Sequence, residues 1–386
     1  MMKGLATAFH RAACAVFLLL LPPACFPADG GTGADGHEPG SAGDPLAAFS
    51  LPSGDWGYGA EAVLEEAFRK CFRTYIVDGK VVTIRMPFGE NNERSELAGS
   101  ELAVEGGGKA DPALQWAAID ALIDSPAFRE YVAVLSDGRE KVVHFDMEAR
   151  SWSASREWFP IDQMKSGVYV GLPHKPAVLS RGRLEATDIY DYVYCMGRLG
   201  MDCSGFVWFA LKTLAARGGI DLDRTAGRYM GTSVADASLF VGTWFFDPRS
   251  PLWMEVKDAA GNLRPADVIL FRGEDGTPVH SAVIQSIDGS TGTVRYLQCT
   301  DEAPQGERGV HESFIHFDPA RPQTSLRDPS VIWHQRLFPP FTGEKGVPYR
   351  DDGERYRAHP ELGGGTVVRL KALEGIAARL PATGGR

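Results

Sequence analysis

The sequence predicts an α+β fold, and two observations carry this prediction. A segment with helical apolar spacing begins at Cys203 and reads "CSGFVWFALKTLAARGG". Three β-rich segments follow, "LRPADVILFRG", "VHSAVIQSI" and "TVRYLQCT", and short turn sequences separate them. Strands joined by short turns pair antiparallel. We therefore expect a helix bearing Cys203 to pack on an antiparallel sheet, after a smaller mixed α/β region.

The first 25 residues have the layout of an export signal. Lys3 and Arg11 precede an apolar run at 12–21, which is too short to span a bilayer comfortably. The "AC" that follows resembles a bacterial lipoprotein box, in which the cysteine becomes the lipidated first residue. The alternative is an ordinary cleavage site beside an incidental cysteine. We expect residues 1–25 to be a lipoprotein-type signal that is lipidated at Cys25.

Residues 26–50 are rich in Gly, Asp and Pro and have no periodicity, which is typical of a flexible tether. A tether behind a lipid anchor lets a domain reach away from the membrane. The expected location is therefore the cell envelope, in the periplasm or on the outer surface, with the membrane as a partner through the anchor.

Composition narrows the classes of function. The chain has 386 residues, of which 44% are hydrophobic, as in a globular protein of about two domains. Its formal charge of −10 argues against a nucleic-acid partner. The six cysteines form no CxxC pair, and His311 and His316 lack further ligands at a readable spacing. We therefore expect no metal site and no cofactor.

Residues 51–183 predict an N-terminal α+β region whose role the sequence does not indicate. Helical spacing at 61–72 leads into a hairpin that turns at the Asp-Gly pair 78–79. A helical stretch broken at Pro126 follows, and "YVAVLSDGREKVVHFDM" then predicts a second hairpin that turns at 137–138.

Residues 184–338 form the second region. A loop leads to the helix at Cys203, a turn-rich passage follows at 219–233, and then come the three strands. The segments "ESFIHF" and "VIWHQRLF" predict one or two more strands. Residues 339–386 are an extension rich in Gly, Pro and charge, in which "VVRLKALEGIAARL" predicts a short helix.

Cys203 lies where a reactive thiol would be placed. A helix N-terminus lowers a thiol pKa through the helix field and its backbone N–H groups. Asp202 or the adjacent turn can cap this helix, and Ser204 and Gly205 allow close backbone approach and N–H donors for an oxyanion. The alternative is that Cys203 is a small buried apolar residue.

A nucleophile also needs a base and a residue that orients the base. His280 opens the second strand, and Gln298 lies on the third, where its side chain could fix the imidazole ring. Taken alone, each of these two side chains is more often an ordinary surface residue. The order of a helix with a cysteine, a strand, a strand that begins with a histidine and a strand with a polar residue rarely arises by chance.

"DCSGFV" at 202–207 resembles the catalytic motif of the NlpC-type cysteine peptidases, which are papain-like hydrolases that cut bacterial cell-wall peptides. The family pattern continues in "LRPADVILF", "HSAVIQ" and "YLQC", so the resemblance covers about 190–300. It implies a papain-like catalytic domain at 184–338. It also implies Cys203 as nucleophile, His280 as general base and later acid, and Gln298 as the orienting residue.

The resemblance extends to residues on the substrate side. Tyr192 matches a tyrosine that borders the active site in this family, and "LDRTAGRYMG" resembles its Pro-Arg-Thr segment, which puts Arg224 and Thr225 beside the substrate. We also assign Asp202 and Ser204, which flank the nucleophile, to the residues that contact the substrate.

The sequence departs from the family pattern at several positions. Ala266 replaces the usual glycine, which is tolerable if its φ is negative. Cys195 and Met196 replace paired glycines at the lip of the cleft. Cys195 and Cys299 could form a disulfide or remain free thiols. Trp152, Trp158, Trp244 and Trp253 could bind glycan, although core packing is the commoner use of tryptophan.

The function implied is hydrolysis of amide bonds in peptidoglycan stem peptides, without a cofactor. One alternative is an amidase or an acyl- or peptidyl-transferase that uses the same three residues. Another is a non-catalytic lipoprotein that binds the cell wall.

Overall fold

The structure is a computed structural model that describes part of the chain. The described residues are 59–89, 111–146, 149–155, 177–197, 199–234, 237–300, 309–335, 352–362 and 364–373. The predicted signal, tether and lipidated Cys25 lie outside these ranges. Among the described helices, none has the length and apolarity needed to cross a bilayer.

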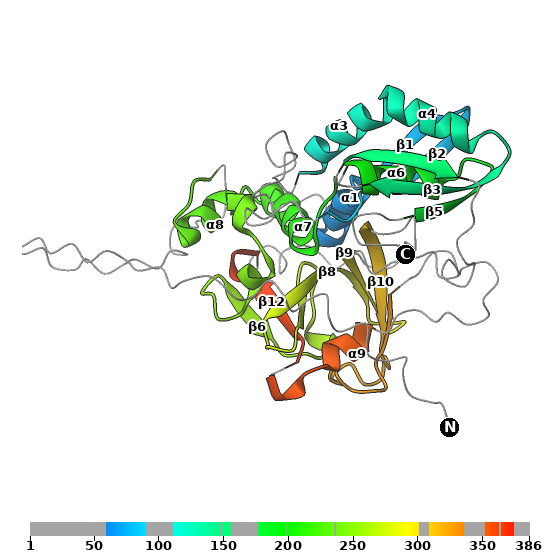
Figure 1. The fold of residues 1–386 in the computed structure, drawn as a ribbon. Coiled ribbons are helices and arrows are strands. Elements are labelled where there is room, and N and C mark those ends of the chain that lie inside the picture. The colour runs from blue at the N-terminus through cyan, green and yellow to red at the C-terminus, as the bar shows by residue number, and fades with distance from the viewer. Residues whose placement is uncertain are drawn as a thin grey trace, which may run out of the picture. The chain divides into compact units, whose positions relative to one another are not determined.

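A seven-stranded sheet in which every neighbouring pair is antiparallel organises the second region (Figure 1). Its strand order is β11-β10-β9-β8-β7-β12-β6. The strands are β6 (Trp253–Val256), β7 (Val268–Arg272), β8 (Pro278–Asp288), β9 (Thr293–Thr300), β10 (Gly309–His316), β11 (Ile332–Gln335) and β12 (Thr366–Leu370). The α+β class and the strands predicted after the Cys203 helix are confirmed.

Strand β12 replaces the first four residues of the helix predicted at 367–380 in the C-terminal extension. Residues 371–373 are helical, and the rest of that segment lies outside the described residues. The five residues of β12 are all buried, and this strand lies between β7 and β6 (Figure 1). Val367 and Val368 point to opposite faces and join two different hydrophobic clusters. β-branched residues that are buried on both faces suit a central strand, so a tertiary position overrides the helical spacing. The extension is therefore part of the central sheet.

Helix α7 (Cys203–Arg217) packs against β8, β9 and helix α1 (Ala60–Arg69). The passage predicted to be turn-rich contains helix α8 (Leu222–Met230), so that prediction is wrong. Asp221 caps α8 by accepting a hydrogen bond from the backbone N–H of Arg224, and Gly231 ends it in the left-handed conformation. The cap and the buried apolar positions outweigh the Gly in its middle.

In the part of the N-terminal region that the structure describes, there are two smaller sheets and the helices α1, α3 (Pro112–Ile123) and α4 (Pro126–Leu135). The hairpin β1 (Phe72–Val77) and β2 (Lys80–Arg85) turns at Asp78 and Gly79, both with positive φ, as predicted. The second sheet has the order β4-β3-β5. The remaining elements of this region are β3 (Glu140–Asp146), β4 (Ser151–Ser155) and β5 (Ala177–Arg181). Helix α6 (Ala186–Tyr192) follows at the start of the second region.

The predicted hairpin at 137–138 is wrong, because α4 occupies its first half. Ser125 caps α4 by accepting from the backbone N–H of Phe128, and Pro126 lies in its first turn. Tyr131 and Val132 belong to the buried face of this helix, so burial at helical spacing outweighs their β propensity. The Asp-Gly pair joins a helix to a strand.

Ala266 has a φ of +74°, which contradicts the expected negative value. It is the third residue of a turn in which the Asp267 N–H donates to the Arg264 carbonyl at 3.1 Å and Pro265 is the second residue. A positive φ at the third position defines a type II turn, where glycine is preferred. An alanine here is strained, because its Cβ crowds the neighbouring carbonyl.

We expect Ala266→Gly to raise the free energy of unfolding by about 0.5–1 kcal/mol, since relief of strain outweighs the extra entropy of the unfolded chain. Urea unfolding measures this change. Ala259 is the matched control, because it is buried with a φ of −131° and its glycine variant should be destabilised. Equal destabilisation of both variants would contradict the assigned strain.

Candidate active site

Asp202 builds the helix terminus that carries Cys203. One of its carboxylate oxygens accepts from the Gly205 N–H, and the other accepts from the Ser204 hydroxyl at 2.9 Å. Asp202 and Ser204 are buried, and Cys203 is 9% exposed as the first residue of α7. The predicted capping role of Asp202 is confirmed. The Gly205 N–H and the Ser204 hydroxyl both donate to this cap.

The Asp202 carboxylate also places a negative charge beside the thiol, which opposes the helix field. We expect Asp202→Asn to keep the cap, because asparagine caps as well as aspartate, and to move alkylation of Cys203 by iodoacetamide about one pH unit lower. Asp202→Ala should lower the pH of alkylation similarly but lose about 1 kcal/mol of stability. An unchanged pH profile in both variants would show that the carboxylate does not act on the thiol.

His280 and Gln298 lie together on neighbouring strands. His280 Nε2 is 2.7 Å from Gln298 Oε1, and the two side chains are 5% and 1% exposed. His280 is opposite Phe271 in the β7–β8 register, with ring centroids 5.4 Å apart. The sequence-predicted pair of histidine and orienting residue is therefore present as a buried hydrogen bond.

Gln298 has two further partners that hold its amide. Its Nε2 donates to Ser313 Oγ at 2.9 Å and to Asp352 Oδ2 at 3.0 Å. Asp352 begins helix α9 (Asp352–Arg357) and also accepts from the Tyr296 hydroxyl at 2.7 Å. Sequence reasoning missed Asp352, because no local pattern marks it and more than fifty residues separate it from Gln298.

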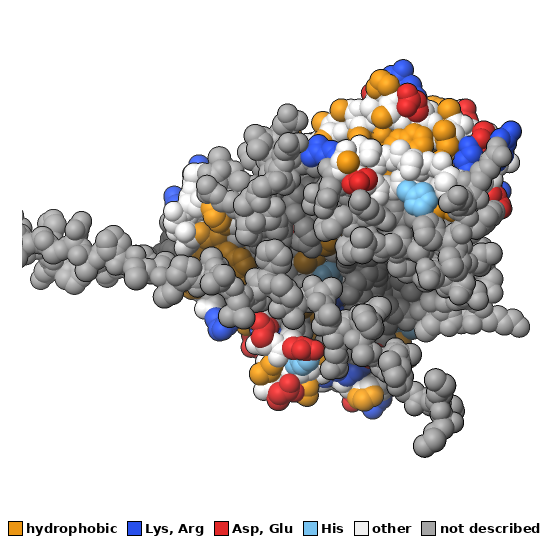
Figure 2. All heavy atoms as spheres, in the orientation of Figure 1, with side chains coloured by type: hydrophobic (Ala, Val, Ile, Leu, Met, Phe, Trp, Pro, Cys, Tyr) orange, Lys and Arg blue, Asp and Glu red, His pale blue; other side chains and the backbone are white. Residues whose placement is uncertain are grey.

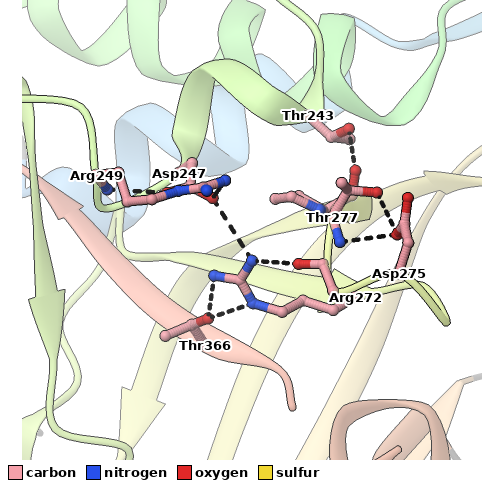
Figure 3. A network of polar contacts seen from close by, with 9 residues as sticks. Thr243, Asp247, Arg249, Arg272, Asp275, Thr277 and Thr366 are labelled. Atoms are coloured by element: carbon pink, nitrogen blue, oxygen red, sulfur yellow. Dashed lines mark hydrogen bonds and ion pairs between the residues drawn. The ribbon is translucent and has the colours of Figure 1, made fainter. Parts of the chain in front are cut away.

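A polar network holds the hairpin that carries His280 (Figure 3). Arg272 donates to the Gly276 carbonyl at 2.7 Å and to Thr366 Oγ1, and it lies 3.5 Å from Asp247 Oδ2. Burial alone would raise the Asp247 pKa, but hydrogen bonds and charges from Arg249 and Arg272 hold that pKa below its ordinary value. The network thus ties the β7–β8 turn to β12.

A second contact fixes the start of β8. The Thr243 hydroxyl donates to the Pro278 carbonyl at 2.7 Å, two residues before His280 (Figure 3). Backbone and side-chain anchors on both sides of the turn give His280 a rigid support.

Helix α7 rests on the strands that carry the pair (Figure 1). Phe206 and Val207, just inside the helix, share a buried cluster with Val283 of β8 and Leu297 of β9. The same packing that buries the helix therefore joins the element bearing Cys203 to the two strands bearing His280 and Gln298.

The predicted substrate-side residues have other partners. Tyr192 is 1% exposed and packs its ring at 5.0 Å from Phe128 and 4.8 Å from Tyr131. Its ring thus packs with aromatic residues of the N-terminal region, and its predicted place at the border of the site stays a prediction. Arg224 and Thr225 lie in the first turn of α8, and their hydrogen bonds go to Asp221.

The four cysteines in the described residues are buried and none of them is in a disulfide, so Cys195 and Cys299 are not bridged. Cys299 donates from Sγ to the Met201 carbonyl at 3.0 Å. Burial raises the pKa of the Cys71 thiol far above its ordinary value. Cys195 lies in a π-helical turn, Val193–Gly197, where it packs with the core.

The tryptophans differ in exposure. Trp253 is 1% exposed and Trp152 packs on Tyr131, whereas Trp158 lies outside the described residues. Trp244 is 51% exposed, and Figure 2 shows hydrophobic side chains gathered beside α8. Core packing thus accounts for two of the four residues.

His311 is buried, and burial lowers its pKa to about 4, so it is neutral. His316 lies near His334, with ring centroids 5.4 Å apart. Within the described ranges, no group of three or more His, Cys, Asp or Glu side chains is arranged to hold a metal ion.

Comparisons of this chain with protein-family models, curated proteins and solved structures give no match. The chemistry of the site therefore has to be inferred from its own residues: a thiol at a helix N-terminus and a buried His–Gln pair on the adjoining strands.

Proposed function

We propose that the protein is an exported cysteine hydrolase that cleaves amide bonds in peptidoglycan stem peptides, on a papain-like catalytic domain of the NlpC type. The observation that supports it best is the 2.7 Å hydrogen bond between His280 and Gln298, on strands that contact the helix begun by Cys203. A cysteine nucleophile needs a thiol at a helix N-terminus and a base held in place, and here the base is held by a buried amide on strands that contact this helix.

In the proposed mechanism, His280 takes the proton of the Cys203 thiol through its Nδ1 atom. The thiolate attacks the amide carbonyl, and backbone N–H groups near Cys203 and Ser204 bind the oxyanion. The protonated His280 gives its proton to the leaving amine as the C–N bond breaks. Water, deprotonated by His280, then hydrolyses the thioester and restores the thiol. No cofactor enters this sequence.

The same proposal covers location and partners. We place the protein in the cell envelope, anchored through Cys25 after removal of the signal, with stem peptides as its substrate. The favoured bond lies between D-glutamate and the diamino acid, as the family resemblance implies.

Digestion of purified peptidoglycan, with products identified by mass spectrometry, tests this function. We expect fragments with a new amino terminus on the diamino acid. Release of whole stem peptides from the glycan would indicate an amidase, and exchanged peptides would indicate a transferase. No products, together with a Cys203 thiol that labels slowly at about pH 6, would favour a non-catalytic wall-binding protein.

A further inference from the structure

We propose that Asp352 is a positioning residue of the active site: it sets the orientation of the Gln298 amide, thereby selects the His280 tautomer, and stabilises the protonated imidazole. The inference deepens the proposed function and rests on it only in taking His280 as the base. It assigns a role in the site to the C-terminal extension.

The Asp352 carboxylate accepts hydrogen bonds from two buried side chains. The Asp352 side chain is 3% exposed, and a single oxygen, Oδ2, accepts from both the Tyr296 hydroxyl and Gln298 Nε2. A buried carboxylate with directed donors is held in one position. Tyr296 is itself fully buried beside Trp333, with ring centroids 5.8 Å apart, so the anchor on the sheet side is rigid.

These contacts determine how Gln298 faces His280. An ionised carboxylate only accepts hydrogen bonds, so the Gln298 group that faces Asp352 must be the NH₂. The amide oxygen then faces His280 and can only accept, which requires a proton on His280 Nε2. In the neutral ring, Nδ1 is consequently unprotonated and can take a thiol proton. A flipped amide would favour the opposite tautomer, which cannot act as the base at Nδ1.

The charge of Asp352 acts in the same direction. It lies two hydrogen bonds from the imidazole, in surroundings shielded from water, and a negative charge there favours the protonated ring. Other charged or titratable groups lie on the surrounding elements: Cys203 and Asp202 at the start of α7, and Arg355 on α9, whose guanidinium lies 5.5 Å from the Phe271 ring centroid. The positive charge of Arg355 disfavours the protonated imidazole and so opposes the effect of Asp352. The test must therefore change Asp352 alone.

NMR titration of His280 in the Cys203→Ala protein tests the inference without relying on catalysis. Nitrogen-15 shifts should show the Nε2-protonated tautomer in the parent protein. Asp352→Asn keeps an oxygen for both donors and removes the charge, so we expect the same tautomer and a His280 pKa about one unit lower. Asp352→Ala should give the lower pKa and a mixture of tautomers.

The matched control is Glu354→Gln, which removes an exposed charge from the same helix and should leave both readouts unchanged. Circular dichroism verifies that each variant is folded. A His280 pKa and tautomer that stay at the parent values in both Asp352 variants would overturn the inference. If these His280 effects are observed but the wild-type protein, with Cys203 intact, cuts no stem peptide, the proposed function alone is rejected.

Discussion

Replacing Cys203 with alanine should lower the rate of stem-peptide cleavage by at least about 10⁴-fold. The thioester cannot form without the sulfur, and the remaining oxyanion donors and binding contacts supply only a small part of the catalysis. Product formation by the purified variant, followed by mass spectrometry over a long digestion, measures the loss. Stability should change little, because the Asp202 cap does not use the thiol.

Cys71→Ala is the control for this experiment. Cys71 is also a buried thiol, but burial raises its pKa and it donates to the Ala67 carbonyl, so it is inert. Its alanine variant should retain cleavage. His280→Asn should lose activity by about 10²–10⁴-fold, as expected for a general base. Full activity in the Cys203 variant would rule out the thiol as nucleophile.

Local chemistry made part of the fold predictable. The Asp-Gly pair at 78–79 specifies a tight hairpin turn, Pro126 separates two helices, and Asp202 caps α7. Each of these features depends on residues at most four positions apart, so it can be predicted without knowing the fold. The pairing of His280 with Gln298 was predictable for a related reason, since consecutive strands joined by a short turn are neighbours.

Long-range features were not predictable in this way. Strand β12 inserts between β7 and β6, which precede it by about a hundred residues, and its partners decide that it is a strand. Asp352 reaches Gln298 for the same reason. No local pattern distinguishes such a residue from the exposed acids around it. The sequence therefore predicts a C-terminal extension outside the catalytic domain, although β12 is a strand of the central sheet.

Family spacing also proved an incomplete guide to side chains. Tyr192 matches the family tyrosine if the loop before Cys203 is one residue shorter, and its ring is buried among aromatic residues of the N-terminal region. Here that region supplies packing partners for the residue, and packing determines where the ring points.

Substitution of Arg369 in β12 should cause a large loss of stability. The Arg369 guanidinium donates to both oxygens of Asp267, at 2.7 and 2.8 Å, and to the Asn262 carbonyl at 2.9 Å. Arg369 and Asp267 are 8% and 1% exposed. Breaking a buried ion pair leaves one charge without compensation, so we expect Arg369→Met to lose about 3–5 kcal/mol at neutral pH.

The loss should depend on pH in a defined direction. Burial raises the Asp267 pKa above its ordinary value despite the attraction of Arg369. A raised folded-state pKa means that the contribution of Asp267 is largest below its unfolded pKa and is lost as pH rises through the folded value. Removing Arg369 raises the Asp267 pKa further. Urea unfolding of Arg369→Met should therefore show a smaller loss at about pH 5 than at about pH 8.

A double variant separates the charge from the packing. Asp267→Asn with Arg369→Met removes both charges and keeps an oxygen for the Arg264 N–H, which donates to Asp267 at 2.7 Å. Most of the lost stability should return, because replacing a whole buried pair is often nearly neutral. If the double variant stays as unstable as Arg369→Met at every pH, the guanidinium is needed for its bond to the Asn262 carbonyl and for packing. The attachment of β12 would then depend on shape, and the pair with Asp267 would be secondary.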